Sequence, residues 1–429
     1  MASTKSLPLS SSIPGGVPSG ASAGSASAPK LPEGVTRGTP EYAVISRALF
    51  FGGFSTFAQL YCMQSLLPLL TTTFGITPAQ ASWSVSAATM MMALGLLVTC
   101  VAADRVSRKR MMTIALLSSS VLTLASAFST NFETVVILGA LKGLALSGLP
   151  AIAMAYLSEE IDQRSLGMSM GLYIGGNILG GMAGRVLAAF VADMFSWRVS
   201  VAVIGLVCLA MGLEFARSLP HSRRFTPRHM SVREAIGHAR RHLGDPALLG
   251  LYLFAGLMMG SFVSVYNYLG FHLAASPFHL PHAAIGAIFA MYLIGVVGSF
   301  IAGPLSDRVG RARLLWVLVA LALVGLVTML ASQVLGVVMG LAIFTFGFFG
   351  AHTVASSWVG RRATQGRAIA SALYLFFYYL GSSLLGSYSG VMLKSHGWHG
   401  VVALLAVAVV LSLAVAMAMR RAYGSGTPR

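Results

Sequence analysis

Charged side chains are scarce in this sequence. Asp, Glu, Lys and Arg make up 10% of its 429 residues, whereas hydrophobic residues make up 56%. A water-soluble domain typically carries about 25% charged residues, because its surface must stay hydrated. The shortage of charge therefore excludes an ordinary soluble protein. The repeated apolar runs, each about 20 residues long, indicate helices that cross a membrane.

Cysteines and nucleotide-binding signatures are scarce too. Cys62, Cys100 and Cys208 are the three cysteines, and they lack the spacing of a metal site. We therefore expect no disulfide and no metal. The chain has no G-x-x-x-x-G-K-S/T loop, which argues against direct use of ATP. One acidic cluster, residues 159–162, is the best candidate for enzyme chemistry. With no other such cluster, the sequence predicts a protein that is not an enzyme and that needs no cofactor.

Twelve apolar segments predict an all-α membrane protein with two pseudo-symmetric six-helix bundles. The expected spans are residues 46–70, 80–103, 110–129, 133–157, 166–192, 198–217, 246–273, 282–304, 312–332, 335–359, 367–392 and 399–419. The expected domains are a disordered cytoplasmic tail (1–42), an N-terminal bundle (43–217), a basic cytoplasmic linker (218–244), a C-terminal bundle (245–420) and a cytoplasmic tail (421–429). Residues 230–243 fit either a basic amphipathic helix on the membrane surface or a plain solvated linker.

The net charge of +17 is unevenly distributed. Most of the 29 Lys and Arg residues fall in the tails and in alternate loops. The exceptions are Lys142, Arg185, Arg198 and Lys394. Such a bias places basic loops on the cytoplasmic side, so both termini are expected in the cytoplasm and the protein in the cytoplasmic membrane. A basic inner face suits anionic lipids rather than nucleic acid.

Two related stretches organise the chain. GPLSDRVGR (residues 303–311) lies between two apolar runs, and CVAADRVSRKR (residues 100–110) repeats its Asp-Arg-Val and its basic ending. They are about half the chain apart, which indicates an internal duplication. Glycine, proline and mixed charge in so short a stretch predict a tight turn between helices. Asp104, Arg108, Asp307 and Arg311 are the expected gating residues, with the acids capping or bridging neighbouring helix ends.

The pattern G-x-L-x-D-R-x-G-R, found once in each half, resembles the signature loop of the major facilitator superfamily. The second copy is nearly complete, whereas Cys100 and Ser107 replace two glycines of the first. The resemblance covers about residues 43–420. It implies a twelve-helix secondary transporter that works by alternating access between its two halves and acts as a monomer.

Further motifs resemble the drug and metabolite efflux branch of that family. GGNILGG (residues 175–181) is similar to the antiporter motif G-P-x-x-G-G, with Asn177 in place of proline. The segments RGTP (37–40), YLSEE (156–160) and ASSW (355–358) resemble YnfM-type bacterial inner-membrane transporters. The resemblance implies efflux of a small organic solute.

Polar and aromatic side chains recur at helical spacing within the apolar segments and predict a substrate cavity. The candidate residues are Tyr61, Gln64, Lys142, Asn177, Arg185, Asn267, Tyr268, His352, Tyr374 and Tyr378. The alternatives are helix–helix packing for the polar and aromatic stripes, and snorkelling to the interface for the two cations.

No acidic residue falls at the middle of a predicted span. Many proton-driven members of the family that the chain resembles use a central carboxylate, so another group must titrate here. His352 is our candidate, with Lys142 as the other possibility. Proton-coupled efflux is the leading hypothesis. The alternatives are a facilitator, an uptake symporter of a small metabolite, and a membrane-embedded transferase.

Overall fold

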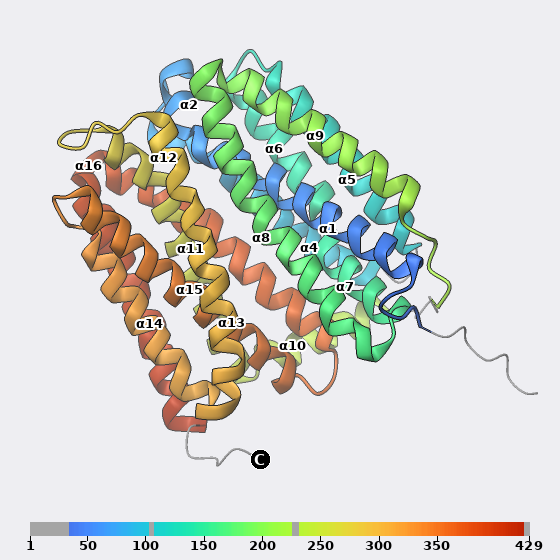
Figure 1. The fold of residues 1–429 in the computed structure, drawn as a ribbon. Coiled ribbons are helices and arrows are strands. Elements are labelled where there is room, and N and C mark those ends of the chain that lie inside the picture. The colour runs from blue at the N-terminus through green and yellow to red at the C-terminus, as the bar shows by residue number, and fades with distance from the viewer. Residues whose placement is uncertain (1–33, 103–106, 225–230, 424–429) are drawn as a thin grey trace, which may run out of the picture. The chain divides into compact units, whose positions relative to one another are not determined.

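The chain folds into a bundle of helices (Figure 1). The computed structural model describes residues 34–102, 107–224 and 231–423. Within these ranges the chain is helical, apart from connecting turns and one isolated β-bridge between Val35 and Ile161. The all-α membrane fold that the apolar runs predicted is confirmed.

The two halves of the chain contribute separate sets of helices. The first half contains α1 (Pro40–Tyr61), η1 (Cys62–Leu66), α2 (Leu67–Phe74), α3 (Pro78–Ala81), α4 (Trp83–Ala102), α5 (Arg108–Ala127), α6 (Phe132–Leu146), α7 (Leu149–Glu160), α8 (Gln163–Met194) and α9 (Trp197–Ser218). The linker contains α10 (Val232–Leu243). The second half contains α11 (Pro246–Ala274), α12 (His282–Ile288), η3 (Phe289–Met291), α13 (Tyr292–Val309), α14 (Arg311–Thr328), α15 (Val334–Arg362) and α16 (Arg367–Tyr423).

The described ranges contain twelve membrane-spanning segments. Eleven helical stretches there are long and apolar enough to cross a bilayer. The last of them, α16, is broken at Gly397, whose φ of 63° and ψ of −158° lie outside helical geometry. Glycine tolerates this conformation because it has no Cβ. The break divides α16 into two helices, each long enough for one crossing at about 20 residues.

Polar side chains at the helix starts explain why the spans begin where they do. Asn131 accepts a hydrogen bond from the backbone N–H of Thr134, and Ser196 accepts one from that of Val199. Asp245 accepts from two N–H groups at the start of α11. Each cap satisfies N–H groups that the helix itself leaves unpaired. The short polar loops therefore mark the span ends.

Glycines bring α8 and α1 into backbone contact. Gly176, Gly180 and Gly184 recur every fourth residue, which places them on one face of α8. A Cβ at each position would overlap with the backbone of Phe50, Phe54 or Ala58 in α1. Small residues at this spacing allow close helix packing in a membrane. The same device joins α11 and α16 through Gly256 and Gly381.

The first span departs from the continuous helix that the sequence predicted. Residues Cys62–Leu66 form a 3-10 helix between α1 and α2. Pro68 explains the change, because it has no N–H to donate to the carbonyl four residues earlier and its ring crowds that carbonyl. A 3-10 turn is the tighter alternative. The candidate residues Tyr61 and Gln64 therefore lie at the break and not on a regular helical stripe.

The hairpin at residues 303–311 is shorter than predicted. We expected a tight turn across the whole stretch, but α13 continues through Pro304 to Val309, and α14 begins at Arg311. Gly310 alone forms the turn, with a φ of 89°. An interior proline removes one backbone hydrogen bond. Here the ion pair between Asp307 in α13 and Arg311 in α14 ties the two helix ends together.

The sequence predicts a disordered tail that includes residues 34–42, whereas the structure gives these residues defined contacts. The N–H of Val35 donates to the Glu160 carbonyl at 2.8 Å, and the N–H of Asp162 donates to the Val35 carbonyl at 3.0 Å. α1 begins at Pro40, capped by Thr39. A β-bridge forms between two segments that can be far apart in the sequence. The composition of residues 34–42 alone therefore could not predict their pairing with residues 160–162.

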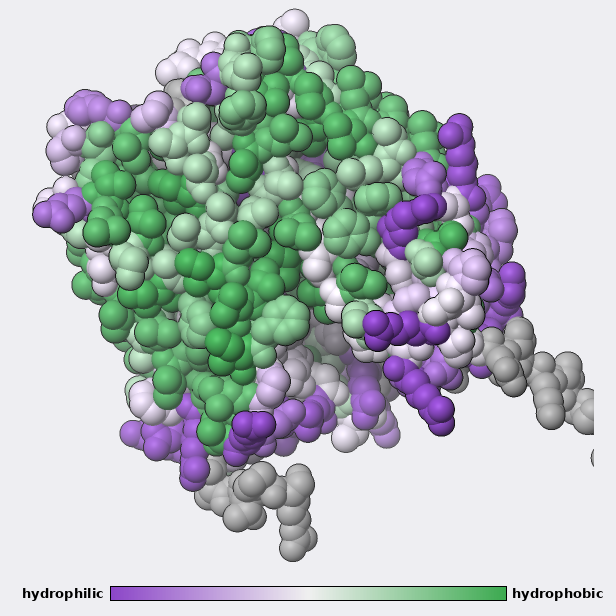
Figure 2. All heavy atoms as spheres, in the orientation of Figure 1, coloured by the Kyte–Doolittle hydropathy of each residue, from purple (hydrophilic) through white to green (hydrophobic). Residues whose placement is uncertain are grey.

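Apolar side chains face outward along the spans. Figure 2 shows a face covered mainly by hydrophobic residues, with hydrophilic residues gathered toward the helix ends. Phe300 is 76% exposed and Val98 is 68% exposed. Exposed apolar patches of this extent mark contact with another apolar phase, and for helices of this length that phase is lipid.

Candidate functional site

A buried arginine lies at the junction of the two halves. Arg185 in α8 is 1% exposed, and its Nε donates to Gln64 Oε1 at 2.5 Å. Its Nη1 donates to the Gly181 carbonyl at 2.5 Å. The guanidinium carbon lies 4.2 Å from the ring centre of Tyr61 and 4.5 Å from that of Tyr292. Among the described residues, no carboxylate forms an ion pair with Arg185.

A hydrogen-bond chain continues from this arginine into the second half. Gln64 Nε2 donates to Asn267 Oδ1 at 2.7 Å and to the Val263 carbonyl at 3.3 Å. Asn267 is 1% exposed, yet its Nδ2 has no acceptor within the described part of the chain. The chain therefore links α8, η1 and α11 and ends on a buried amide donor. We call Arg185, Gln64 and Asn267 the arginine relay.

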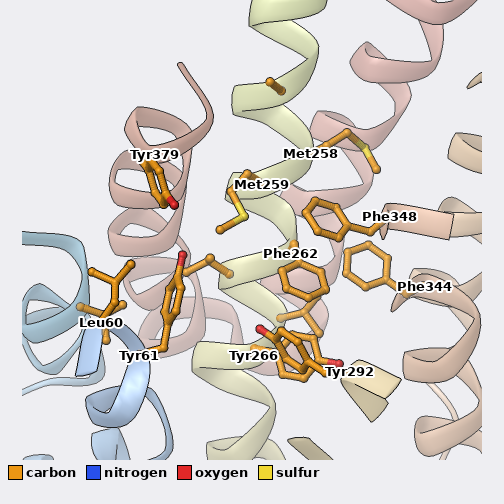
Figure 3. Packing of buried hydrophobic residues seen from close by; sticks show 14 of the residues in the cluster. Leu60, Tyr61, Met258, Met259, Phe262, Tyr266, Tyr292, Phe344, Phe348 and Tyr379 are labelled. Carbon is orange, nitrogen blue, oxygen red and sulfur yellow. The ribbon is translucent and has the colours of Figure 1, made fainter. Parts of the chain in front are cut away.

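Aromatic rings surround the arginine relay on the side of the second half. Figure 3 shows Tyr61 apart from a group that contains Phe262, Tyr266, Tyr292 and Phe348. Phe262 and Phe348 stack with their ring centres 4.0 Å apart. Tyr292, which contacts Arg185, is not among the residues that the sequence predicts for the site. It follows the 3-10 turn η3 and belongs to no polar stripe, so the sequence carried no local signal for it.

His352 and two tyrosines form a second cluster. His352 Nδ1 lies 2.9 Å from the Tyr374 hydroxyl, and its ring lies 4.8 Å from the Tyr378 ring. The Phe348 ring stacks at 6.1 Å and connects this cluster to the aromatic group beside Arg185. The structure thus brings together His352, Tyr374 and Tyr378, which the sequence placed on two different spans.

The remaining candidates lie elsewhere. Tyr268 donates to the Gly386 carbonyl at 2.7 Å and ties α11 to α16. Asn177 packs against α1 at Gly53, and its Oδ1 has no donor among the described residues. Lys142 is 1% exposed on α6, which packs against α4 and α5. No contact found in the described ranges joins Lys142 to the arginine relay.

Ion pairs gather at the end of the bundle that carries the α4–α5 and α13–α14 connections, which we call the hairpin end. Arg108 Nη2 lies 2.9 Å from Glu159 Oε1. Asp307 pairs with Arg311 and also lies 3.2 Å from Arg361 Nη2. Asp104 lies outside the described residues. The structure therefore places three of the four expected gating residues in ion pairs.

The linker contacts the acidic end of α7. The Glu160 carboxylate accepts from the Ser222 hydroxyl at 2.5 Å and from the N–H groups of Arg223 and Arg224 at 2.8 and 3.0 Å. Tyr156 donates to the Pro220 carbonyl at 3.0 Å. The acidic pair at the end of α7 therefore holds both a hairpin arginine, through Glu159, and the start of the linker, through Glu160.

Among the described residues, the hydrogen bonds between the halves lie at the end opposite the hairpins. The Ser383 hydroxyl donates to the Ser86 carbonyl at 2.9 Å, and the Ser387 and Ser86 hydroxyls are 3.0 Å apart. The bond from Gln64 to Asn267 lies toward the same end. In contrast, each ion pair described above stays within one half. Within the described residues, hydrogen bonds thus join the halves at one end, whereas these three ion pairs at the other end do not cross between the halves.

Asp245 joins α11 to the α15–α16 connection and borders a cavity. Its Oδ2 lies 2.9 Å from Arg362 Nε, and its Oδ1 caps α11. Burial alone would raise the pKa of Asp245, but the hydrogen bond from Arg362 and those from the N–H groups of Ala247 and Leu248 lower it. The adjoining cavity, of about 370 Å³, is also lined by Arg241, His242 and Gln365.

We expect the Asp245 ion pair to contribute its full stabilisation only at pH values above the usual range of carboxyl pKa values. The lowered pKa means that the contribution is present above about pH 4 and is lost as the pH falls through the folded-state pKa. Asp245→Asn keeps the helix cap but loses the ion pair, so it should cost about 0.5–1 kcal/mol. Asp245→Ala loses both and should cost about 1 kcal/mol more. Thermal unfolding at pH 7 checks the order; equal midpoints for the two variants would contradict it.

The fold and site define a class: a multi-pass membrane protein of two six-helix halves that meet around buried polar and aromatic side chains. The family model of the Major Facilitator Superfamily matches residues 49–384 and 273–428. The chain belongs to that superfamily and is a membrane transporter of its type. Homologues named as transporters support a transport role and not an enzymatic one.

Two relatives match most of the chain. The MFS-type transporter YybF of Bacillus subtilis (strain 168), described as uncharacterized, is 42% identical over 88% of this chain and 94% of its own. The inner membrane transport protein YnfM of Escherichia coli (strain K12) is 41% identical over 90% of this chain and 93% of its own. The resemblance to YnfM-type transporters is therefore confirmed.

A solved structure shares the fold. A bacterial homologue of the human lysosomal transporter Spinster, in an inward-facing and unoccupied conformation, has a TM-score of 0.73 at 14% identity. The match covers 91% of this chain and 100% of that one. At this identity the likeness shows the fold alone.

Proposed function

We propose that the protein is a secondary active transporter that exports a small organic solute across the cytoplasmic membrane by alternating access, coupled to protons. The observation that carries the proposal is the uneven contact between the halves. Hydrogen bonds join them at the end opposite the hairpins, through Ser86 with Ser383 and through Gln64 with Asn267. Because the ion pairs described for Arg108, Asp307 and Arg311 each stay within one half, the halves can part there.

The orientation follows from charge. The hairpin end carries Arg311, Arg361 and Arg362, together with the basic helix α10. Basic loops stay on the cytoplasmic side, so this end and both termini face the cytoplasm. Arg108 and Arg311, held by Glu159 and Asp307, would then serve as gating residues that respond to the opening of the inner end.

Transport is tested first without a known substrate. A strain that overproduces the protein and a strain that lacks it are grown against a panel of toxic organic compounds, and a solute that separates them is labelled. Purified protein in proteoliposomes should then exchange this labelled solute against its unlabelled form. Saturable binding with no exchange would point to a receptor, and chemical conversion of the solute would point to a transferase.

His352 is the proposed proton-coupling group, so His352→Gln should lose only the pH-driven part of transport. Glutamine can still hydrogen-bond to the Tyr374 hydroxyl but cannot titrate. We expect flux driven by a pH gradient to fall at least about tenfold, while flux driven by the solute gradient alone persists.

The matched control for His352 is His272→Gln. His272 also lies in a spanning helix, where it stacks on Trp398 at 4.9 Å. It should retain both kinds of flux. If His352→Gln also keeps both, protons do not couple through His352. A carrier with no pH-driven flux in the wild type is instead a facilitator, or a symporter of another ion.

A further inference from the structure

We infer that the arginine relay recognises an anionic group, so that the transported solute is an organic anion with a flat apolar body. The inference rests on the proposed transport function and assigns a substrate class to the junction between the halves. It follows from the charge of the site, from the direction of its hydrogen bonds and from the rings beside it.

The site holds a buried cation for which the described part of the chain supplies no ion-pair partner. Arg185 is 1% exposed, and the acidic residues within the described ranges lie at or near helix ends, with Asp193 eight residues further along α8. Removing an unpaired charge from water is costly. The carbonyl of Gly181, the amide oxygen of Gln64 and two ring faces offset part of that cost. A carboxylate or sulfonate oxygen would supply the partner that the described residues do not.

The direction of the hydrogen bonds also selects an acceptor. Arginine can only donate, so Gln64 must present its oxygen to Arg185 and its nitrogen to Asn267. Asn267 must in turn present its oxygen to Gln64, which leaves Nδ2 as the free end of the chain. The relay therefore ends on a donor. The Tyr61 hydroxyl, which is 4% exposed, also lacks a partner among the described residues.

An anion is the ligand that satisfies both features. It brings acceptor oxygens only, so it would pair with the cation and with the unused amide donor at once. An ammonium ion would repel Arg185 and offer further donors. A neutral ligand would leave the charge uncompensated.

The rings indicate the shape of the rest of the solute. Tyr61 from the first half and Tyr292 from the second face the guanidinium at 4.2 and 4.5 Å. Figure 3 shows Tyr292 within the aromatic group that continues to Phe348, with Tyr61 apart from that group. Such a lining suits a flat apolar body beside the anionic group.

The position of the site couples binding to the motion of the halves. Arg185 and Asn267 are each 1% exposed, so an anion enters only when the bond from Gln64 to Asn267 opens. That bond joins the two halves. Binding therefore requires the movement that alternating access provides, and the anion takes over contacts on both sides of the junction.

The test compares three ligands of one size on the purified full-length protein. Benzenesulfonate is the anion, benzenesulfonamide is the neutral analogue and benzyltrimethylammonium is the cation. Cys62 and Cys208 are free and buried, so a thiol-reactive fluorophore reports unfolding during heating. We expect benzenesulfonate to raise the midpoint by about 3 °C at concentrations well above its Kd, and the other two ligands to have no effect.

Two variants and a control connect the effect to the relay. Arg185→Gln should abolish the shift with benzenesulfonate. Asn267→Asp should abolish it as well, because its carboxylate occupies the place of the anion; this variant decides the matter if Arg185→Gln does not fold. Arg198→Gln, which removes an arginine that lies over Trp197, should keep the full shift.

The outcomes separate this inference from the proposed transport. Equal shifts with all three ligands, or an anion shift that survives Arg185→Gln or Asn267→Asp, overturns the anion site. The anion site is also overturned if the protein exchanges a labelled neutral or cationic solute while benzenesulfonate leaves its unfolding midpoint unchanged. In that case the proposed transport still holds. An anion shift that depends on Arg185, in a protein that exchanges no solute, upholds the site and rejects transport.

Discussion

Gly180→Val is expected to remove nearly all folded protein from the membrane. A Cβ at position 180 would lie 2.6 Å from the carbonyl carbon of Phe54 in α1, well inside contact distance. Both sides of this contact are backbone, so no flexible side chain can move away. Overpacking of an interior typically costs about 1–3 kcal/mol and sometimes more, and we expect the upper end. Size-exclusion chromatography of a fluorescent fusion should show at least a tenfold loss of the monodisperse peak.

The control lies on the same helix. Gly175→Val places the same side chain where no atom beyond the adjoining turns of α8 lies within 4 Å of the new Cβ. Both variants change helix propensity equally, so the difference between them reports the contact with α1. Similar yields for the two variants would mean that α8 and α1 are not held at backbone distance.

A disulfide between Ser86→Cys and Ser387→Cys is expected to stop transport completely. The two hydroxyls lie 3.0 Å apart across the junction of the halves, a separation from which two cysteine sulfurs can reach bonding distance. The bond would lock the end opposite the hairpins. Alternating access needs this end to open, so exchange of the labelled solute should fall to background after oxidation and return after reduction.

A matched cysteine pair within one half tests whether the loss of transport comes from locking the junction between the halves. The Ser264 and Ser389 hydroxyls are 2.9 Å apart, but both belong to the second half, on α11 and α16. The double cysteine variant at these positions should also cross-link, as mass spectrometry can verify, and should keep its transport. Full transport by the oxidised Ser86–Ser387 pair would show that the halves do not separate there.

The residues of the arginine relay show which features of the site could be predicted from the sequence. Gln64, Arg185 and Asn267 stood out because polar side chains in apolar spans are costly and need a purpose. Their mutual contacts were not predictable, since the three residues lie on three different spans. Gln64 and Arg185 meet through helix packing within the first half, and Asn267 meets Gln64 across the junction of the halves. Tyr292 illustrates the same limit, because an aromatic residue in a membrane helix carries no signal until its neighbours are known.

At two places the local residue pattern led to a wrong prediction of the backbone structure. The hairpin stretch 303–311 contains the residues of a turn, yet α13 runs through Pro304 and Gly310 alone turns the chain. The polar stripe near Gln64 suggested a regular helix, yet the backbone tightens into a 3-10 helix before Pro68. In both cases a single proline or glycine set the backbone geometry, and neighbouring contacts decided how far the helix extended.

The sequence by itself determined the membrane fold, the number of spans and the family. These follow from the length and spacing of apolar runs and from motifs that recur in each half, because the bilayer permits few alternatives to a full-length helix. The tertiary structure decided which buried groups meet: Arg185 with Gln64 and Tyr292, and His352 with Tyr374. The physical reason is that these contacts depend on how whole helices rotate and pack, which is set by backbone approaches such as that between Gly180 and Phe54 and not by any local pattern.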